Sequence, residues 1–184
     1  MDRAAAVSDN RLQLDRTAWG LADARRAAAQ VLANPALLSP LMRSLFGEDP
    51  MLRHHAADTS RRITEKQPEL LAPYADRLLG LFSEIGSRES GENWRTRAHL
   101  GLVVARIAQN RAQRLRAAGL LMLLYYDPSN VVRCTAVEGL GMLAWREPGL
   151  RAQVQPLIEE ALATGTIAMQ CRARDALARL GRRD

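Results

Sequence analysis

A segment that recurs four times is the feature of this chain that most limits its fold. Each copy places a large apolar residue directly before a polar residue, here termed the anchor, and an alanine three residues after it. The four anchors are Arg53, Arg95, Arg133 and Gln170. They are spaced 42, 38 and 37 residues apart, which is typical of repeat proteins whose unit is a short group of helices.

The residues around each anchor predict a helix with one buried face. Apolar or small residues stand mainly at positions −1, +3, +6 or +7 and +10 from the anchor, which matches 3.6 residues per turn. The sixth position is always small, so that a neighbouring helix can approach closely; its occupants are Thr59, Gly101, Gly139 and Ala176. We expect these second helices of each repeat near residues 50–66, 92–108, 129–146 and 166–181.

A second set of amphipathic runs lies between these helices. We expect first helices near residues 35–46, 69–84, 111–126 and 149–163, three of them with a proline that opens or kinks the helix. Asp49-Pro50 and Asp127-Pro128 predict helix starts with a capping carboxylate. A further helix is expected near residues 10–33, with Gly20 as a point where it can break. Glycines and serines in residues 83–93 predict a flexible loop, and the whole chain, 1–184, is expected to form one domain.

Composition favours an all-α chain. Apolar residues make up 47% of the sequence, only 4% are aromatic, and alanine and leucine dominate. The longest apolar stretch, 117–126, is far short of the roughly 20 residues that span a bilayer, and no signal peptide is evident, so we expect a cytoplasmic protein. The net charge of +6 comes almost wholly from arginine. Because excess arginine and alanine also reflect a GC-rich genome, this charge is a weak indication of nucleic-acid binding.

The repeated motif resembles that of the HEAT-repeat family. Second helices carry an apolar residue, Arg or in the last copy Gln, two further residues and Ala, and the expected first helices include Leu-Leu-Ser-Pro-Leu at 37–41 and Leu-Leu-Ala-Pro-Tyr at 70–74. From about Val31 onward the chain resembles uncharacterised bacterial HEAT-repeat proteins, most clearly in residues 68–74 and 164–169. The resemblance implies a right-handed α-solenoid of about four antiparallel helix pairs plus an N-terminal helix. It also implies a role in protein–protein contact and brings no catalytic residues with it.

Residues of the second helices that the core does not require are the candidates for partner binding. They stand at positions +2, +5 and +9 from the anchor, and we expect them to line the concave side of the stack. Trp145, at +12, shares the stripe of Glu138 and Met142 and is read either as an interface residue or as the end of the core. The candidates are His55, Asp58, Arg62, Arg97, Glu138, Met142, Trp145, Arg172, Asp175 and Arg179. The alternative is that these charges form only a solvated surface.

We expect the anchors to have a structural role, and we expect the histidines and cysteines to form neither a metal site nor a disulfide. The anchors are expected to bridge to an acidic or carbonyl group in a neighbouring turn. His54 and His55 point about 100° apart on a helix, so we predict no metal site. Cys134 and Cys171 are expected to be reduced thiols. No phosphate-binding loop, nucleophile elbow or zinc-protease motif is found, and we predict neither catalysis nor a cofactor.

Two functions from different classes follow. The first is a non-catalytic scaffold that binds an unidentified protein or peptide on its concave face. The alternative is DNA binding, as in alkylpurine DNA glycosylases built from HEAT-like repeats, with Glu138, Trp145 and Arg97 in the groove. Mixed charges and few aromatic residues on the expected groove favour the scaffold. Activity like that of HEAT-like bilin lyases has no specific residue to support it.

Overall fold

The computed structural model describes residues 12–14, 17–86 and 93–181, and these residues form nine α-helices and no strand. The predicted all-α class is therefore confirmed. The helices are α1 (Leu21–Ala33), α2 (Leu38–Phe46), α3 (Pro50–Lys66), α4 (Ala75–Gly86), α5 (Trp94–Ile107), α6 (Arg111–Leu124), α7 (Asn130–Arg146), α8 (Arg151–Thr164) and α9 (Ile167–Gly181).

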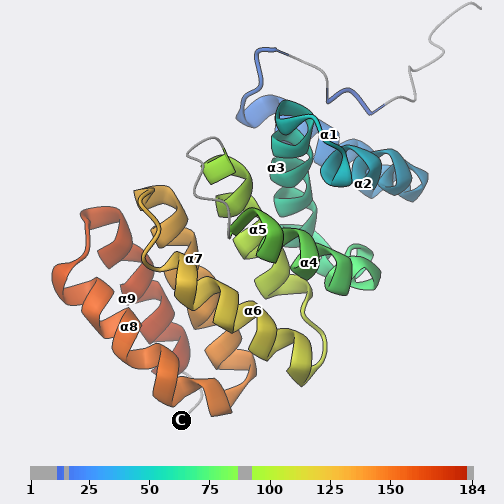
Figure 1. The fold of residues 1–184 in the computed structure, drawn as a ribbon. Coiled ribbons are helices and arrows are strands. Elements are labelled where there is room, and N and C mark those ends of the chain that lie inside the picture. The colour runs from blue at the N-terminus through green and yellow to red at the C-terminus, as the bar shows by residue number, and fades with distance from the viewer. Residues whose placement is uncertain (1–11, 15–16, 87–92, 182–184) are drawn as a thin grey trace, which may run out of the picture.

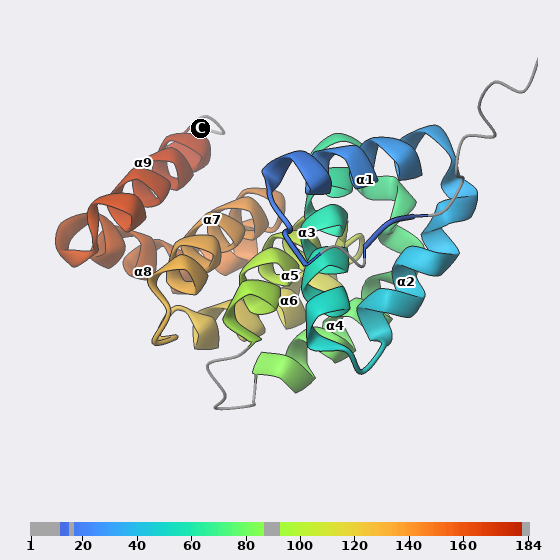
Figure 2. The ribbon, with the colours of Figure 1, turned by 90° about the horizontal axis from the view of Figure 1, so that it is seen from above.

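The second helices α3, α5, α7 and α9 begin and end within about two residues of the predicted bounds. Each packs against the next of this set, and α1 packs against α3. The first helices α2, α4, α6 and α8 each pack against the second helix that follows them in the chain. The helices thus succeed one another across the molecule in chain order (Figures 1 and 2).

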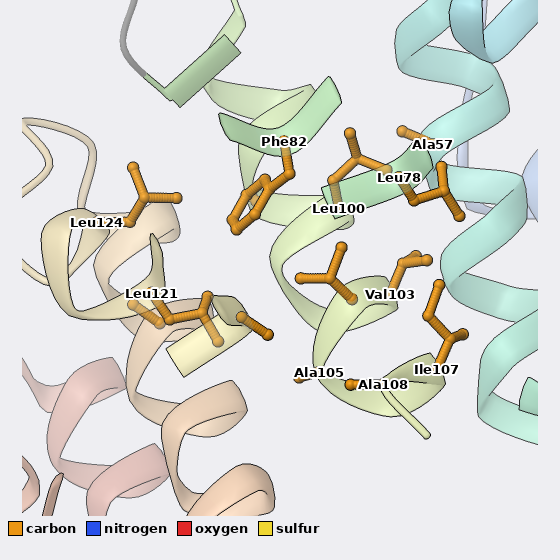
Figure 3. Close-up of a cluster of buried hydrophobic side chains, with 14 of the residues drawn as sticks. Ala57, Leu78, Phe82, Leu100, Val103, Ala105, Ile107, Ala108, Leu121 and Leu124 are labelled. Carbon is orange, nitrogen blue, oxygen red and sulfur yellow. The ribbon is translucent and has the colours of Figure 1, made fainter. Parts of the chain in front are cut away.

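The apolar core follows this succession of helices. In its central part, Leu100 and Val103 of α5 lie between Ala57 of α3 and Phe82 of α4, all of them buried (Figure 3). Leu121 of α6 continues the cluster toward α7, where its side chain contacts the position of Gly139. Burial of these side chains, at about 25 cal/mol per Å², is the main force that holds the helices together.

Arginines also tie successive second helices together through backbone carbonyls. Arg106 of α5 donates to the carbonyl of Arg61 in α3, at 3.2 Å. Arg146 of α7 donates to the carbonyls of Ala105, at 3.0 Å, and Ala108, at 2.6 Å, where α5 ends. Because the last carbonyls of a helix have no partner within the helix, the contacts of Arg146 satisfy groups that would otherwise need water. The Arg61 carbonyl lies inside α3 and also accepts from the hydroxyl of Thr64, at 2.9 Å.

Three of the first helices begin in a 3₁₀ turn rather than in an α-helix. The turns are Pro35–Leu37, Pro68–Leu70, Ala72–Tyr74 and Pro148–Leu150. Each holds a proline in its first turn, which has no N–H to give and a backbone angle already close to helical. Two such turns precede α4, so this helix begins at Ala75 and not at residue 69.

The N-terminal helix is shorter than the predicted span of 10–33. It begins at Leu21, while Gly20 is extended and donates its N–H to Asp23, at 3.1 Å. Residues 12–14 and 17–20 are not helical. Leu14 and Trp19 instead contact His55 of α3, through a 2.6 Å hydrogen bond between the Leu14 carbonyl and Nδ1 and through ring stacking. These contacts replace those that another turn of helix would have made.

The predicted flexible loop at 83–93 is wrong at its start. Residues 83–86 complete α4, because Ile85 is buried in the core and holds the last turn in place. Asn93 is also buried, directly before α5. Residues 87–92, including Arg88, lie outside the described part of the chain.

The predicted caps at the two Asp-Pro pairs differ in detail. Asp49 caps α3 as expected, accepting hydrogen bonds from the backbone N–H groups of Met51, at 2.8 Å, and Leu52, at 3.1 Å. Helix α7 begins three residues after Asp127, whose Oδ1 accepts from the N–H of Ser129 at 2.7 Å. Asp127 therefore fixes the turn before α7, and its second oxygen is left for another partner.

Candidate functional site

Charged side chains connect the four second helices on one surface. Arg106 of α5 lies 4.0 Å from Glu65 of α3 and 3.8 Å from Glu138 of α7, and Arg172 of α9 lies 3.3 Å from the other oxygen of Glu138. Burial lowers the pKa of Arg106, while Glu138 and Glu65 oppose that shift. We call the surface around Glu65, Arg106, Glu138 and Arg172 the second-helix face.

The second-helix face includes part of the predicted partner-binding set. Arg172, Asp175 and Arg179 of α9 are exposed, and together with Glu138 they line a shallow pocket of about 120 Å³. Met142 is half-buried and Trp145 is 41% exposed. Met142 stands one turn after Glu138 and Trp145 stands two turns after it, on the same side of α7. On α7 and α9 the residues predicted to bind a partner therefore do lie at the surface.

Other members of the predicted set are buried. His55 and Asp58 of α3 lie beneath the segment that precedes α1, and Asp58 accepts a hydrogen bond from Trp19 Nε1 at 3.3 Å. Arg62 is partly exposed and lies 3.6 Å from Asp58. The expectation that this row is open to solvent is therefore wrong for His55 and Asp58, because the chain before α1 covers them.

Helix α5 presents a different set of residues from the predicted one. Arg97 is 4% exposed and donates to Asp127 at 2.9 Å, so its guanidinium is not available to a partner. His99 and Arg106 face the ion pairs instead, and Arg95 is exposed. The placement of Arg97 on an open surface is thus wrong, because a buried carboxylate on the turn before α7 holds it inside.

The anchors make short-range contacts. Arg53 donates to the carbonyl of Gly47, through Nε at 3.1 Å and also through a terminal nitrogen, and Gln170 donates to the carbonyl of Gly165 at 2.9 Å. These glycines follow α2 and α8, so each anchor closes the turn before its own helix. Arg133 lies 3.5 Å from Asn130, whereas Arg95 lies over the ring of Trp94, with 4.6 Å from Cζ to the ring centroid.

A pocket of about 300 Å³ opens where α3 and α5 meet the chain before α1. Its lining includes two tryptophans, two histidines and one buried carboxylate, and we call it the tryptophan pocket. These residues are Trp19, His54, Asp58, Trp94 and His99, with Arg62, Leu21 and Val131 also in the lining. Sequence reasoning identified Asp58 and Arg62 as candidates but missed both tryptophans as surface residues.

The imidazoles of the tryptophan pocket are held in the neutral form. Burial lowers the pKa of His99 to about 4, and Asp58, with Nδ1 and Oδ1 3.7 Å apart, only partly opposes this. Burial also lowers the pKa of His54, whose ring is stacked on that of His99 with 5.5 Å between centroids. At neutral pH the pocket therefore offers imidazole groups that can both donate and accept hydrogen bonds.

Exposed apolar side chains lie in this pocket and at the start of α9. Leu21 and Val131, in the pocket lining, are each 48% exposed. Ile167, the first residue of α9, is outside the lining and is 82% exposed. The hydroxyl of Thr166 donates to Asn130 at 2.9 Å, which brings the start of α9 beside that of α7. We call Leu21, Trp94, Val131 and Ile167 the apolar edge, because they lie at or near the N-terminal ends of their helices.

Within residues 12–14, 17–86 and 93–181, no group of three or more histidine, cysteine, aspartate or glutamate side chains is arranged to hold a metal ion. Within the same ranges no helix has both the length and the apolar character needed to cross a bilayer. Cys134 and Cys171 are both free thiols.

No family model matches this chain, nor does any curated protein or solved structure in the three comparisons made.

Proposed function

We propose that this chain is a HEAT-type α-solenoid that acts as a non-catalytic, cytoplasmic scaffold for another protein. The partner would lie on the second-helix face of α7 and α9 and on the apolar edge beside it. The observation that carries this proposal is the exposure of large apolar side chains, Val131 and Ile167 above all, next to a surface of paired charges.

The fold class and the succession of helices support the solenoid. Each second helix packs on the next second helix, and each first helix packs on the second helix that follows it. In such an array equivalent positions recur at regular intervals. The anchors Arg53 and Gln170 close equivalent turns after α2 and α8. A repeated contact of this kind is expected of a repeated structural unit.

The chemistry of the surface supports a protein partner. Protein interfaces combine an apolar centre, enriched in tryptophan, methionine and arginine, with a polar rim. Trp145, Met142 and Ile167 would supply the apolar area, and Arg172 and Glu138 the orientation. Because Glu138 already pairs with Arg106 and Arg172, a partner would meet preorganised charges, which lowers the cost of ordering them on binding.

Cys171 provides a test of this assignment. It is exposed and stands one turn after Ile167 on α9, so a benzophenone maleimide attached there would lie beside the proposed interface. Irradiation in a lysate of the source cell should join the chain to one predominant protein. The glutamate variant Ile167→Glu and the double variant Met142→Ala/Trp145→Ala should each reduce the yield, on the order of tenfold, because a hot-spot loss exceeds 1 kcal/mol.

Leu123→Glu is the matched control. Leu123 is 72% exposed on α6 and lines a small apolar pocket with Phe82 and Leu124, away from the proposed interface. The same apolar-to-acidic change there should leave the yield unaltered. If Leu123→Glu abolished the cross-link and Ile167→Glu did not, the binding face would be that of the first helices and the proposal would be wrong.

The alternative, a DNA-binding or alkylpurine DNA glycosylase-type protein, has less support than the scaffold. Arg97 is buried against Asp127 and Glu138 is paired with two arginines, so the three residues suggested for that role do not form an open basic groove. Binding to phosphates would weaken steeply between 50 and 200 mM salt. A duplex oligonucleotide bound with that salt dependence, and lost in Arg172→Gln and Arg179→Gln, would favour the alternative.

A further inference from the structure

The tryptophan pocket is continuous with the proposed interface, because it shares residues with the apolar edge. Leu21, Trp94 and Val131 belong to the edge and also line the pocket of about 300 Å³. Leu21 and Val131 are each 48% exposed, so much of their apolar surface faces solvent. A partner that covers the apolar edge therefore also meets the pocket.

The polar groups in the lining are answered inside the protein. Oδ2 of Asp58 accepts a hydrogen bond from Nε1 of Trp19 at 3.3 Å. Oδ1 of Asp58 lies 3.6 Å from Nε of Arg62 and 3.7 Å from Nδ1 of His99, and all three atoms are buried. A ligand therefore does not reach this carboxylate, and the pocket offers a ligand mainly its apolar side chains.

The size and the walls of the pocket suit one large side chain. Sites that hold a whole small molecule measure about 300–1,000 Å³, so this pocket stands at the bottom of that range. Two tryptophan rings line it, Trp19 from the chain before α1 and Trp94 from the start of α5. Because aromatic rings pack well against one another, offset or edge to face, we expect an aromatic side chain as the occupant.

Positive charge gathers at the same place. Arg95 is exposed, with Cζ 4.6 Å from the centroid of the Trp94 ring, and none of the described carboxylates forms an ion pair with it. The pocket also lies at the starts of α5 and α7, where helices carry partial positive charge. The side chains of the N-cap residues, Asn93 and Ser129, accept no hydrogen bond from these helices. A carboxylate from a partner would complement this charge.

We propose that the tryptophan pocket receives an aromatic side chain from an acidic segment of the protein partner, with a neighbouring carboxylate bound by Arg95 at the starts of α5 and α7. This inference rests on the scaffold function proposed above and adds the chemistry of the partner.

The charges favour an acidic peptide over a nucleic acid. A nucleic acid strand is held by several Lys or Arg contacts to its phosphates. Among the described residues that line the pocket, Arg95 is the one cation without a carboxylate partner, since Arg62 lies beside Asp58 and Glu65. One such cation beside an apolar cavity matches a peptide, in which a carboxylate can stand next to an aromatic ring.

The probe is a displayed library of random dodecapeptides, selected on the immobilised full chain. Enriched peptides should share an aromatic residue with an aspartate or glutamate directly beside it. A synthetic copy of the most enriched peptide should change the tryptophan fluorescence of the chain, because Trp19 and Trp94 line the pocket. Its affinity should fall, without vanishing, as salt screens the charges. Enriched peptides that lack acidic residues, or a selection that enriches none, would overturn the proposal.

Variants at two exposed residues test the position of the peptide. Val131→Glu adds a carboxylate to the first turn of α7, where a helix favours one, so the fold is retained. It should weaken binding of the selected peptide roughly tenfold or more, through repulsion and lost apolar contact, and Val131→Gln should weaken it less. Arg95→Gln should cost about three- to tenfold, as one charge-assisted contact does.

Arg116→Gln is the matched control, because Arg116 is also exposed but lies on α6 and outside the pocket lining. It should bind the selected peptide like the parent chain. Unchanged affinity in both Val131→Glu and Arg95→Gln would contradict the assignment. An oligo(dT) strand that displaced the peptide, and was itself lost in Val131→Glu, would assign the pocket to nucleic acid and overturn it as well.

The cross-link from Cys171 separates this inference from the scaffold function. A cellular protein that is cross-linked there, and that excess selected peptide displaces, supports both. A cross-linked protein that the peptide does not displace, and that Val131→Glu retains, leaves the scaffold in place and overturns the pocket assignment. Failure to cross-link any protein contradicts the scaffold alone, since the peptide selection and the variants need no cellular partner.

Discussion

Arg97 and Asp127 form a buried ion pair that joins α5 to the turn before α7, with Nε and Oδ2 2.9 Å apart and both side chains 4% exposed. The other oxygen of Asp127 holds the N–H of Ser129. The same carboxylate therefore fixes the start of one repeat and neutralises a charge that belongs to the previous one.

Removing this carboxylate should destabilise the fold strongly. Asp127→Ala removes the carboxylate that pairs with the buried guanidinium of Arg97, and losing one partner of a buried ion pair costs about 3–5 kcal/mol. Urea unfolding followed by circular dichroism would measure the change in the free energy of unfolding. The double variant Arg97→Met/Asp127→Ala should recover a large part of the loss, because no charge is then buried. If Asp127→Ala unfolds at the same urea concentration as the parent, the pair is not essential.

The contact between α7 and α9 should be too close to accommodate a methyl group at Gly141. A Cβ atom at Gly141 would lie 2.5 Å from Cβ and 3.2 Å from Cα of Ala176, so the two helices would have to separate. We expect Gly141→Ala to cost about 1–3 kcal/mol in thermal or urea unfolding. Gly119→Ala is the matched control, because no atom lies within 4 Å of its Cβ position in α6. Alanine there should stabilise the chain by about 0.5–1 kcal/mol.

Stability should fall in mild acid because of His99. Its pKa is lowered from 6.5 to about 4 in the folded chain, so the unfolded chain binds more protons between these values. The neutral ring contributes its full stability above pH 6.5, and this contribution is lost as the pH falls toward 4. The loss is on the order of 3 kcal/mol. Urea unfolding between pH 7.5 and 4.5 would show it.

His99→Gln is the variant that identifies the source of this pH dependence. Glutamine does not titrate, so the slope of unfolding free energy against pH should become shallower. It should not vanish, because burial also lowers the pKa of His54. A variant with the slope of the parent chain would show that His99 is not the group responsible.

The two cysteines should differ in reactivity. Cys171 is exposed on α9, whereas Cys134 is half-buried and burial raises the pKa of its thiol. Because the thiolate is the reactive form, a thiol reagent at pH 7.5 should modify Cys171 at least several-fold faster than Cys134. Cys171→Ser should remove the fast phase of the reaction, and Cys134→Ser should remove the slow one. The reverse assignment would contradict the burial of Cys134.

The repeat pattern was sufficient to predict the second helices but not which polar residues of α5 are buried. The spacing of apolar and small residues placed α3, α5, α7 and α9 within about two residues of their observed bounds. Arginine stands at both 95 and 97, so the local pattern cannot tell which of them is buried. That choice depends on Asp127, thirty residues away in the chain, and a helical period contains no such information.

The tryptophan pocket was hidden from sequence reasoning for a similar reason. Trp19 belongs to a segment that the pattern assigned to a helix, whereas its described residues, 12–14 and 17–20, are not helical and contact His55 of α3 through Leu14 and Trp19. Trp94 stands directly before the anchor Arg95, at a position that the helical pattern assigns to the buried face. Nothing local brings these two side chains together with His99. The one available signal was the pairing of Asp58 and Arg62 one turn apart, which did identify two residues of the lining.

The arginine contacts between second helices give the chain a direction of assembly. Arg146 lies at the end of α7, and the carbonyls it binds lie at the end of α5, some forty residues earlier. During synthesis the end of α5 must therefore remain bound to water until α7 leaves the ribosome. A chain released early, before residue 146, would lack the donor that completes α5, and the end of that helix would stay open to water.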